Sequence, residues 1–226
     1  MNTAIIVAAG SGSRFDPENP KQFVELLGRQ LLVHTMEKFE RAESVNSVVL
    51  VVAKQYVDTY AKSLEKYGFT KIFAVVPGGE TRAESVRNGL NAVDTRTEFV
   101  AVHDGARPLV TVDEIDRTIA RAKETGAACL VAAVTDTIKS IRGDEIAATL
   151  DRAQLRRALT PQAFKIEVLK KAFDGVSLDK SVTDECYLVE RLGHPIAIVE
   201  GSVRNIKITH PEDLILAEAL LSQEIK

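Results

Sequence analysis

Six short apolar runs, rich in valine and isoleucine, recur along this chain of 226 residues, and helix-period segments lie between most of them. The runs are "AIIVAA", "SVVLVVA", "KIFAVV", "FVAVHD", "CLVAAV" and "PIAIVE". Continuous apolar runs of this length are typical of strands that are buried on both faces of a sheet. Alternation of such strands with helices builds βαβ units, so we expect an α/β fold with a mostly parallel sheet and helices on both faces.

The helix-period segments carry start signals of their own. The segments are "LLVHTMEKFERA", "YVDTYAKSLEKYG", "TRAESVRNGLNAV" and "TVDEIDRTIARAKETG". Thr81 with Glu84, and Thr111 with Glu114, have the spacing of a capping box, which satisfies free backbone N–H groups at a helix start. Pro211 suits the first turn of a helix near the carboxyl terminus, where a missing N–H costs nothing. These signals predict three helix starts.

One segment departs from the alternation of strands and helices. Residues 135–157, "TDTIKSIRGDEIAATLDRAQLRR", alternate apolar and polar side chains around the turn-like "RGDE". This pattern predicts a β-hairpin that projects from the sheet as an arm. Because we find no repeat, low-complexity tract or interdomain linker, residues 1–226 are expected to form a single domain.

Composition limits the partners and the environment of the chain. The net charge of −3 disfavours nonspecific nucleic-acid binding, so phosphate recognition must come from individually placed cations. No apolar run approaches the length of a membrane span, and the first run is predicted to be a core strand, not a signal peptide, so a cytoplasmic protein is expected. Cys129 and Cys186 lie in apolar segments without a CxxC motif, and we expect both to be reduced packing residues.

The loop "VAAGSGSRFDPENPKQF" follows the first predicted strand, and ligands bind at the carboxyl ends of parallel strands. Gly10 and Gly12 allow the backbone to approach a phosphate, while Arg14 and Lys21 add positive charge. Phe15 stands where a dinucleotide-binding G-x-G-x-x-G motif needs its third glycine, and no "GK[ST]" of a P-loop appears. The loop is either a phosphate-binding loop or an ordinary turn, because glycine and proline are common in both.

Two more loops follow predicted strands. "VHDGARPLV" places Asp104, suited to a metal or to hydroxyl groups, beside Arg107, suited to a phosphate; the alternative is a simple ion pair within the turn. "GGETRAESV" places Arg82 and Ser85 on one face of a helix whose amino terminus attracts anions. Arg82 is alternatively a solvated helix charge. His103 is expected to be a packing residue.

Two segments nearer the carboxyl terminus add further polar candidates. "LDRAQLRRALTPQAF" carries Arg152 and Thr160, and "VRNIKITHPED" carries Lys207. Lys207 lies between two isoleucines of a strand-like run, so alternation points its side chain away from their face. A lysine in this place is either a guard against aggregation on an edge strand or a ligand for an anion.

Six segments occur in order, "AAGSGSRF", "PKQF", "GGETRAESV", "HDGARP", "LTPQAF" and "NIKIT". Together they resemble the cytidylyltransferases that activate sugar-alcohol phosphates, most closely the 2-C-methyl-D-erythritol 4-phosphate cytidylyltransferases of the non-mevalonate isoprenoid pathway. The resemblance spans nearly the whole chain. It implies a Rossmann-like nucleotidyltransferase fold, CTP as donor, Mg²⁺ as companion ion, and a homodimer whose arms embrace the partner.

A sister family that acts on ribitol 5-phosphate shares the first loop and the "TPQ" segment. It more often has a bulky valine where this chain has Ala106, so methylerythritol phosphate is the expected acceptor and ribitol 5-phosphate is the alternative. Two other classes fit part of the pattern. An NAD-dependent oxidoreductase would share the sheet but lacks its third glycine here, and a noncatalytic nucleotide-binding protein would keep the loops but lose Lys21 or Arg14.

The resemblance also implies roles for individual residues. The residues expected to be catalytic are Arg14, Lys21, Arg152 and Lys207. The residues expected around the nucleotide are Ala8, Ala9, Gly10, Gly12, Gly79, Glu80, Arg82, Ser85 and Gly105. The residues expected around the acceptor are Asp104, Arg107, Thr137, Arg152, Thr160 and Lys207. Asp104 is also a candidate Mg²⁺ ligand, although the phosphates of CTP are expected to hold most of the metal. Gly105 and Glu80 stand where the family more often has alanine and aspartate, which changes no proposed charge.

Overall fold

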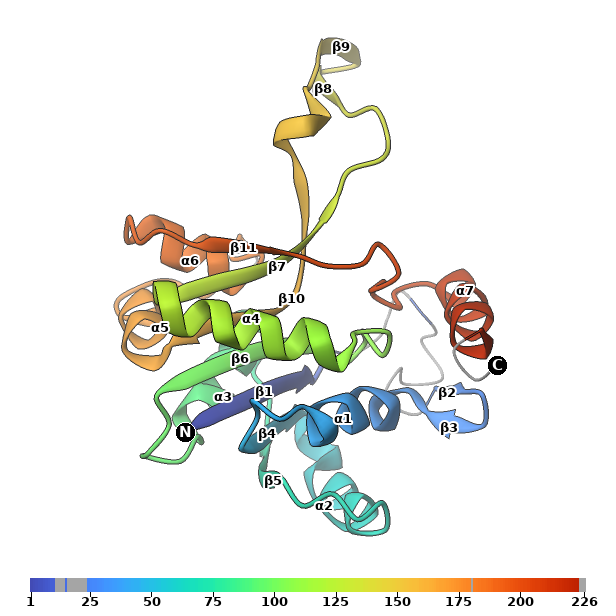
Figure 1. Ribbon diagram of the computed structural model, residues 1–226, viewed down its shortest axis with the longest axis vertical. Helices are drawn as coiled ribbons and strands as arrows, with labels where there is room; N and C mark the ends of the chain where they lie inside the picture. The colour runs from blue at the N-terminus through green and yellow to red at the C-terminus, as the bar shows by residue number, and fades with distance from the viewer. Residues whose placement is uncertain (11–14, 16–23, 180, 224–226) are drawn as a thin grey trace.

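A computed structural model describes residues 1–10, 15, 24–179 and 181–223. Its centre is a seven-stranded sheet in the order β11-β7-β10-β6-β1-β4-β5 (Figure 1). These strands are β1 (Asn2–Ala8), β4 (Ser47–Val52), β5 (Ile72–Pro77), β6 (Phe99–Asp104), β7 (Ala127–Ala133), β10 (Arg156–Lys165) and β11 (Ala197–Glu200). Neighbouring strands are parallel except where β10 takes part. The mostly parallel sheet is confirmed, and each of the six apolar runs forms one of its strands.

The seventh strand, β10, is not predicted by the sequence patterns. Its sequence, "RRALTPQAFK", begins with two arginines and contains Pro161, a residue usually excluded from the interior of a sheet. The register with β7 shifts between Ala158 and Gln162, so the proline lies within an irregularity of the ladder. Beyond it, Ala163 and Phe164 are fully buried on opposite faces of the sheet. Tertiary pairing therefore overrides the local sequence signal.

Helices cover both faces of the sheet, as expected (Figure 1). One apolar layer involves α1 (Leu31–Arg41), α2 (Val57–Glu65) and α4 (Val112–Thr125), and the other involves α3 (Arg82–Asn91), α5 (Ile166–Phe173) and α6 (Glu185–Arg191). Alternation along β1 sends Ile5 into one layer and Ile6 into the other, and both side chains are fully buried. The centre of the sheet is thus buried on both faces, which explains its continuous apolar runs, whereas the edge strands β5 and β11 are only partly buried.

The predicted helix starts are confirmed. The Thr81 hydroxyl accepts the Glu84 N–H at 3.1 Å, and the Glu84 carboxylate accepts the Thr81 N–H at 3.3 Å. Thr111 forms the same capping box at the start of α4. Pro211 is the first residue of α7 (Pro211–Ser222), which lies beside the small hairpin of β2 (Glu25–Leu26) and β3 (Arg29–Gln30) in Figure 1. The short helices α5 and α6 are not predicted by the sequence analysis.

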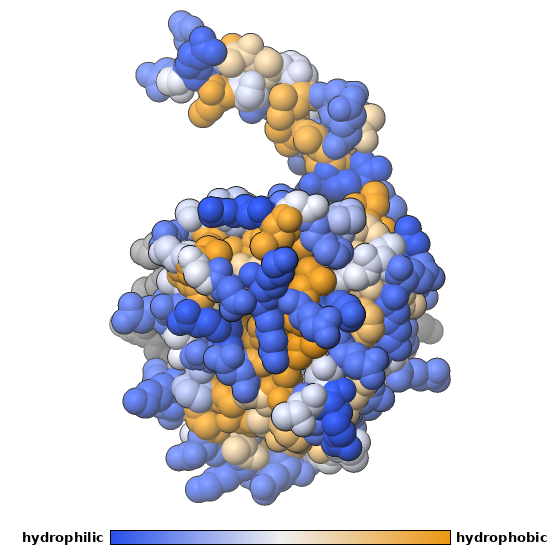
Figure 2. Space-filling view, turned by 90° about the vertical axis from the view of Figure 1, so that its left-hand side faces the viewer, coloured by the Kyte–Doolittle hydropathy of each residue, from blue (hydrophilic) through white to orange (hydrophobic). Residues whose placement is uncertain are grey.

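The predicted arm is a hairpin of β8 (Lys139–Arg142) and β9 (Glu145–Thr149). It stands clear of the body of the molecule in Figures 1 and 2. Gly143 lies at its turn with a φ of 59°, in the left-handed region that favours glycine. The predicted end of the arm at residue 157 is wrong, because Arg156 and Arg157 pair with β7 and belong to the central sheet.

Two expectations drawn from composition concern the helices and the cysteines. None of the helices in the described part of the chain combines the length and apolar character that a bilayer crossing needs. Cys129 and Cys186 are both buried and neither forms a disulfide. Their prediction as packing residues is therefore confirmed.

Gly89 of α3 lies against β1 and β4. A Cβ at this position would lie 2.5 Å from Ile5 Cγ2 and 2.9 Å from Val51 Cγ2. We predict that Gly89→Ala destabilises the protein by about 1–3 kcal/mol, because overpacking outweighs the roughly 1 kcal/mol that alanine gains in helix propensity. The measurement is the free energy of unfolding in urea. Asn91→Ala, an exposed change in the same helix, is the control and should alter stability by less than about 0.5 kcal/mol. A stabilised Gly89→Ala protein would contradict this packing.

Candidate active site

The loops after β1, β5 and β6 meet at the carboxyl edge of the sheet, where ligands of parallel sheets bind. Gly105, which follows β6, donates its N–H to Val7 O at 2.9 Å, and a Cβ there would lie 3.0 Å from Ala8 Cβ. Gly78, which follows β5, is closer still, since a Cβ there would lie 2.2 Å from Ala9 Cβ. The absence of a side chain at both glycines lets the three loops touch. Three predicted nucleotide-binding residues, Ala8, Ala9 and Gly105, are thereby brought together.

The loop of Gly79 and Glu80 is closed by hydrogen bonds to the first turns of α3, which carries Ser85. The Gly79 N–H donates to Ser85 Oγ at 3.1 Å, and the Ser85 hydroxyl donates to Thr81 O at 2.9 Å. The Glu80 N–H donates to Glu84 Oε2 at 2.8 Å. Since Ser85 is only 2% exposed, its hydroxyl shapes the loop from the inside. Direct contact of Ser85 with a nucleotide stays a prediction.

Asp104, the last residue of β6, is the centre of a group of charges. Its Oδ1 accepts a hydrogen bond from Arg82 Nε at 2.9 Å, and its Oδ2 lies 2.8 Å from Lys207 Nζ. Arg107 Nε lies 3.6 Å from the same Oδ2. Burial alone would raise the pKa of Asp104, but the charges of Arg82, Lys207 and Arg107 outweigh it and hold the pKa far below its usual range. Asp104 is therefore ionised, and both of its oxygens are engaged.

Glu185, the first residue of α6, holds Arg82 from the other side. Arg82 Nη1 donates to Glu185 Oε1 at 2.6 Å, and Nη2 donates to Oε2 at 3.1 Å. Glu185 is fully buried, and this burial raises its pKa although the Arg82 charge acts in the opposite direction. Arg82 thus bridges two carboxylates, so its alternative interpretation as a solvated helix charge is wrong. We call Arg82, Asp104, Arg107, Glu185 and Lys207 the charge cluster.

Glu185 is a member of this cluster that the sequence analysis misses. The preceding Asp184 caps α6 by accepting the Tyr187 N–H at 2.9 Å, and it also accepts Gln162 Nε2 at 2.9 Å. An aspartate before an apolar stretch is an N-cap signal that could have placed α6. No local signal pairs Glu185 with Arg82, however, because the two are 103 residues apart in sequence.

Arg107 is held by backbone and amide groups of the carboxy-terminal segment. Its Nη1 donates to Asn205 O at 2.7 Å, and Asn205 Nδ2 donates to Thr160 O at 3.1 Å. Asn205 is fully buried, so this contact ties the loop after β6 to the carboxy-terminal segment. Burial lowers the pKa of Arg107, although Asp104 favours its charged form. Arg107 therefore does form the ion pair with Asp104 that was the alternative interpretation, but it also binds the backbone of Asn205.

Thr160 and His103 fix the end of β6. His103 Nε2 lies 3.2 Å from Arg107 O, and because a carbonyl only accepts, Nε2 carries the proton. Burial lowers the pKa of His103 to about 3, so the ring is neutral and its Nδ1 accepts the Thr160 hydroxyl at 3.0 Å. The Thr160 oxygen also accepts the Asp104 N–H at 3.1 Å. His103 is confirmed as a packing residue, and Thr160 positions Asp104; a contact of Thr160 with the acceptor stays a prediction.

Lys207 comes from a segment that is not a strand, so this part of the prediction is wrong. Residues 201–210 form a turn and extended chain that dock on the loop after β6, where the Ile208 N–H donates to Ala106 O at 2.9 Å. Without an edge strand there is no edge for the lysine to guard. The predicted direction of the Lys207 side chain is nevertheless correct, because Ile208 is fully buried while Lys207 turns toward Asp104.

Several predicted site residues lie elsewhere. Thr137 and Arg152 are exposed on the arm, where Arg152 Nη1 donates to the backbone oxygen of Thr135. The structure does not bring them to the charge cluster of their own chain. Gly10 follows β1 and is exposed, and the last three predicted residues, Gly12, Arg14 and Lys21, fall outside the described part of the chain.

The charge cluster does not fit a protein-held Mg²⁺. Magnesium needs oxygen ligands in a near-octahedral arrangement, but the Asp104 carboxylate already serves two donors and lies beside a third cation. Three nearby positive charges would also repel a divalent ion. The described residues contain no group of three His, Cys, Asp or Glu side chains that could hold a metal. Asp104 is therefore not assigned as a metal ligand.

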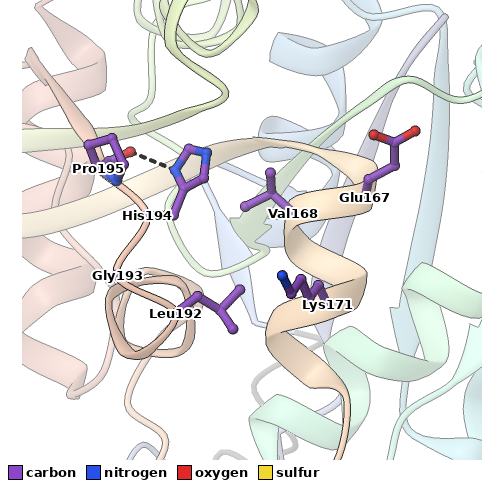
Figure 3. Close-up of a pocket in the computed structure, with 7 residues that line it drawn as sticks. All are labelled: Glu167, Val168, Lys171, Leu192, Gly193, His194 and Pro195. Carbon is purple, nitrogen blue, oxygen red and sulfur yellow. Dashed lines mark hydrogen bonds between the residues drawn. The ribbon is translucent and has the colours of Figure 1, made fainter.

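A hollow of about 390 Å³ lies at the opposite edge of the sheet (Figure 3). Glu167, Val168 and Lys171 of α5 form one side, and residues 192–195 before β11 form the other. His194 Nδ1 donates to Pro195 O at 2.8 Å. Because α5 follows the antiparallel β10 and the loop precedes β11, this hollow is at the amino edge of the parallel strands. No predicted site residue lines it.

Comparison with known proteins shows to which family the chain belongs. The family model described as 2-C-methyl-D-erythritol 4-phosphate cytidylyltransferase matches residues 2–223. The chain belongs to this family. A cytidylyltransferase of that name from Syntrophus aciditrophicus is 43% identical over 224 residues, covering 98% of this chain and 96% of the relative. Another from Alkaliphilus oremlandii is 42% identical over 222 residues, covering 97% and 94%.

Solved structures of cytidylyltransferases share the fold. The crystal structure of 4-diphosphocytidyl-2C-methyl-D-erythritol synthase from Anaerococcus prevotii has a TM-score of 0.87 and 33% identity, covering 98% of this chain and 96% of that one. The 2-C-methyl-D-erythritol 4-phosphate cytidylyltransferase from Francisella tularensis has a TM-score of 0.80 and 34% identity, covering 96% and 98%. The expected Rossmann-like fold is confirmed, and these relatives give no support to the ribitol alternative.

The buried pair of Arg82 and Glu185 should be a large contribution to the stability of this cytidylyltransferase-family chain. We predict that Glu185→Gln destabilises it by about 3–5 kcal/mol, because the buried Arg82 charge loses a carboxylate that offsets it. Glu190→Gln, an exposed change in the same helix, is the matched control and should cost less than about 0.5 kcal/mol. The measurement is chemical denaturation of both variants. Equal stability of the two variants would show that the ion pair does not hold α6.

Proposed function

We propose that this chain transfers CMP from CTP to 2-C-methyl-D-erythritol 4-phosphate, giving 4-diphosphocytidyl-2-C-methyl-D-erythritol and pyrophosphate for isoprenoid biosynthesis. Family membership over residues 2–223 is the observation that carries this proposal. The charge cluster supports it, since three positive side chains against two negative ones leave one net positive charge at the carboxyl edge. A cytoplasmic location, expected from the sequence, is part of the proposal.

The reaction needs alignment more than proton transfer. The second pKa of a phosphate monoester is about 6, so the acceptor phosphate is largely ionised at neutral pH. One of its oxygens attacks the α-phosphorus of CTP, the bond from that phosphorus to the bridging oxygen breaks, and pyrophosphate leaves with the electron pair. No general base is required. The work of the protein is then to hold both phosphates in line and to offset their charge.

The acceptor side is built around Lys207 and Asp104. The Lys207 side chain is 36% exposed, compared with 24% for Arg82 and 13% for Arg107, so it is the cation of the cluster most open to an incoming phosphate. In our proposal the acceptor phosphate binds Lys207 and Arg107, while the ionised Asp104 accepts hydrogen bonds from the hydroxyl groups of the acceptor. Arg82 stays bound to its two carboxylates and keeps Asp104 in place.

The donor side combines the first loop with the three touching turns. In our proposal Arg14 and Lys21 neutralise the triphosphate, with Gly10 and Gly12 allowing its close approach. Ala8, Ala9, Gly79, Glu80 and Gly105 surround the cytosine and ribose, on a surface too closely packed for a purine. We propose that Mg²⁺ accompanies CTP on its phosphates, and no residue of the chain is assigned to hold it.

The arm supports the proposal of a homodimer. Ile141, Ile146 and Leu150 are 73%, 67% and 40% exposed, and Figure 2 shows apolar side chains along the arm. An isolated two-stranded hairpin is at best marginally stable in water, so this surface needs a partner. A second copy of the chain supplies one, and a two-fold interface is self-complementary. Thr137 and Arg152 would then complete the acceptor site of the partner.

The activity is tested by pyrophosphate release. We expect release with CTP and 2-C-methyl-D-erythritol 4-phosphate, and little with ribitol 5-phosphate as acceptor. ATP in place of CTP should be a poor donor, because in our proposal the loops of Ala9 and Gly78, which touch at the donor site, leave no room for a larger base. Equal turnover with ATP would contradict the donor site, and preferential turnover of ribitol 5-phosphate would contradict the acceptor.

A shared site is tested by mixing two inactive variants. Lys21→Ala should lower kcat by roughly 10²–10³, the usual cost of removing one preorganised charge. If Arg152 serves the partner, a mixed dimer of Lys21→Ala and Arg152→Ala has one pocket with both lesions and one with neither. An equimolar mixture that is unfolded and refolded together should then regain roughly a quarter of wild-type activity. No recovery, once mixed dimers are shown to have formed, would leave Arg152 with a local role.

A further inference from the structure

Arg157, near the start of β10, is an exposed cation to which neither the packing of the sheet nor the charge cluster gives a role. Among the described residues, no carboxylate forms an ion pair with it. Its neighbour Arg156 differs, since Arg156 Nε donates to Glu200 Oε1 at 2.7 Å. A solvated arginine is ordinary on a protein surface, so the place of Arg157 in the fold decides whether its charge matters.

The pairing of β10 carries Arg157 past the end of β6. The two strands are antiparallel, so residues early in β10 lie beyond the carboxyl end of β6, where the chain leads on to the arm (Figure 1). Thr160 follows this course, because its hydroxyl oxygen accepts the Asp104 N–H at 3.1 Å. Arg157 comes three residues before Thr160, and Arg107 comes three residues after Asp104. Both arginines therefore lie beyond the last residue of β6, at the carboxyl edge.

The same pairing sends Arg157 and Arg156 to different faces of the sheet. Opposed residues of antiparallel strands share a face. Arg157 is in register with Ala132, which is fully buried in the layer of α1, α2 and α4, whereas Arg156 is in register with Ala133. The loop of Arg107 leads into α4. Arg157 thus shares its side of the sheet with that loop, and Arg156 points to the other side.

The charge of Arg157 is felt at Arg107. Burial is the main cause that lowers the pKa of Arg107, Asp104 acts in the opposite direction, and the positive charges of Arg157 and Arg82 lower it further. Two guanidinium groups near each other repel unless an anion offsets them. Asp104 already binds Arg82 and Lys207. The positive charge shared by Arg107 and Arg157 is therefore only partly offset by the described carboxylates.

The charge balance matches a phosphate monoester. The charge cluster alone has one net positive charge, and Arg157 raises this to two. A phosphate monoester carries about −1.5 to −2 charges at pH 7. A guanidinium group also presents its N–H donors as a planar fork that fits two oxygens of one phosphate. The charge of an incoming phosphate is thus matched only when Arg157 takes part.

We propose that Arg157 binds the acceptor phosphate together with Arg107 and Lys207 of the same chain. This inference rests on the proposed cytidylyl transfer and adds a third cation to its acceptor side. Arg107 and Lys207 are held by Asn205 and Asp104, whereas the exposed Arg157 can turn toward the phosphate as it enters. Its loss should weaken binding of the acceptor and leave binding of CTP unchanged.

The test compares Arg157→Gln with its neighbour. Arg157→Gln should raise the KM for the acceptor by roughly tenfold or more, the size expected for one lost hydrogen bond between charged groups, with the KM for CTP changed by less than about threefold. Arg157→Lys should regain part of the acceptor affinity, because it restores the charge without the fork. Arg156→Gln, which removes the same charge from the opposite face, is the matched control and should change neither constant.

A second measurement does not depend on turnover. Inorganic phosphate is titrated into each protein without CTP and followed by ³¹P NMR. We expect Arg157→Gln to weaken phosphate binding by roughly tenfold relative to the wild-type protein, and Arg156→Gln to leave it unchanged. Unchanged phosphate binding in Arg157→Gln would overturn the inference, as would an equal loss in Arg156→Gln, which would reveal a general effect of surface charge.

The two measurements separate this inference from the proposed function. If the wild-type protein releases no pyrophosphate with CTP and methylerythritol phosphate, the proposed function fails, while the phosphate titration still decides whether Arg157 belongs to an anion site. If transfer occurs and the KM for the acceptor is the same in Arg157→Gln and the wild-type protein, the proposed function stands and the role of Arg157 is refuted. A wild-type protein that binds no phosphate would also refute it.

Discussion

One carboxylate, that of Asp104, is shared by cations from three separate parts of the chain. Arg82 comes from α3, Arg107 from the loop after β6, and Lys207 from the segment before α7. A buried charge is costly unless it is paired, so the folded state requires all three segments to converge on the end of β6. Glu185 extends this requirement to α6, since it holds the far side of Arg82. The charge cluster is therefore complete only when these segments are brought together at the carboxyl edge.

The charges alone would not place these segments, and the apolar contacts beneath them supply the rest. Glycines after β5 and β6 let the loops approach each other closely. An apolar cluster around α7, which includes Leu109, Ile208 and Ala217, supports the loop of Arg107 and the segment of Lys207. Sites built on rigid elements hold their geometry better than sites on loops alone. Here the loops are made rigid by packing, by the buried Asn205 and by the neutral His103, which fixes the backbone oxygen of Arg107. The exposed arm is the exception, and in our proposal a second copy of the chain covers its apolar surface.

Local patterns predicted most of the fold, and long-range pairings account for what they missed. Six strands of the sheet and the capped helices follow from side-chain periodicity and capping, which depend on neighbours in sequence. The strand β10 was missed because Pro161 and two arginines argue against a strand, and only its neighbours β6 and β7 make it one. Lys207 was placed on the correct side of the chain but in the wrong kind of element, since docking on Ala106 replaced a strand ladder. Glu185 could not be paired with Arg82 by any local rule.

The central claim is that Asp104 stays ionised because three cations share it, and the carboxyl ¹³C resonance of this residue tests that claim most directly. Selective aspartate labelling gives the spectrum, and comparison with Asp104→Asn identifies the signal. Because the folded-state pKa is depressed, the resonance should keep its ionised position as the pH is lowered from 7 to about 4. An ordinary aspartate, with a pKa of about 3.9, would be nearly half protonated at the end of that range. A titration of that kind in the folded protein would contradict the account.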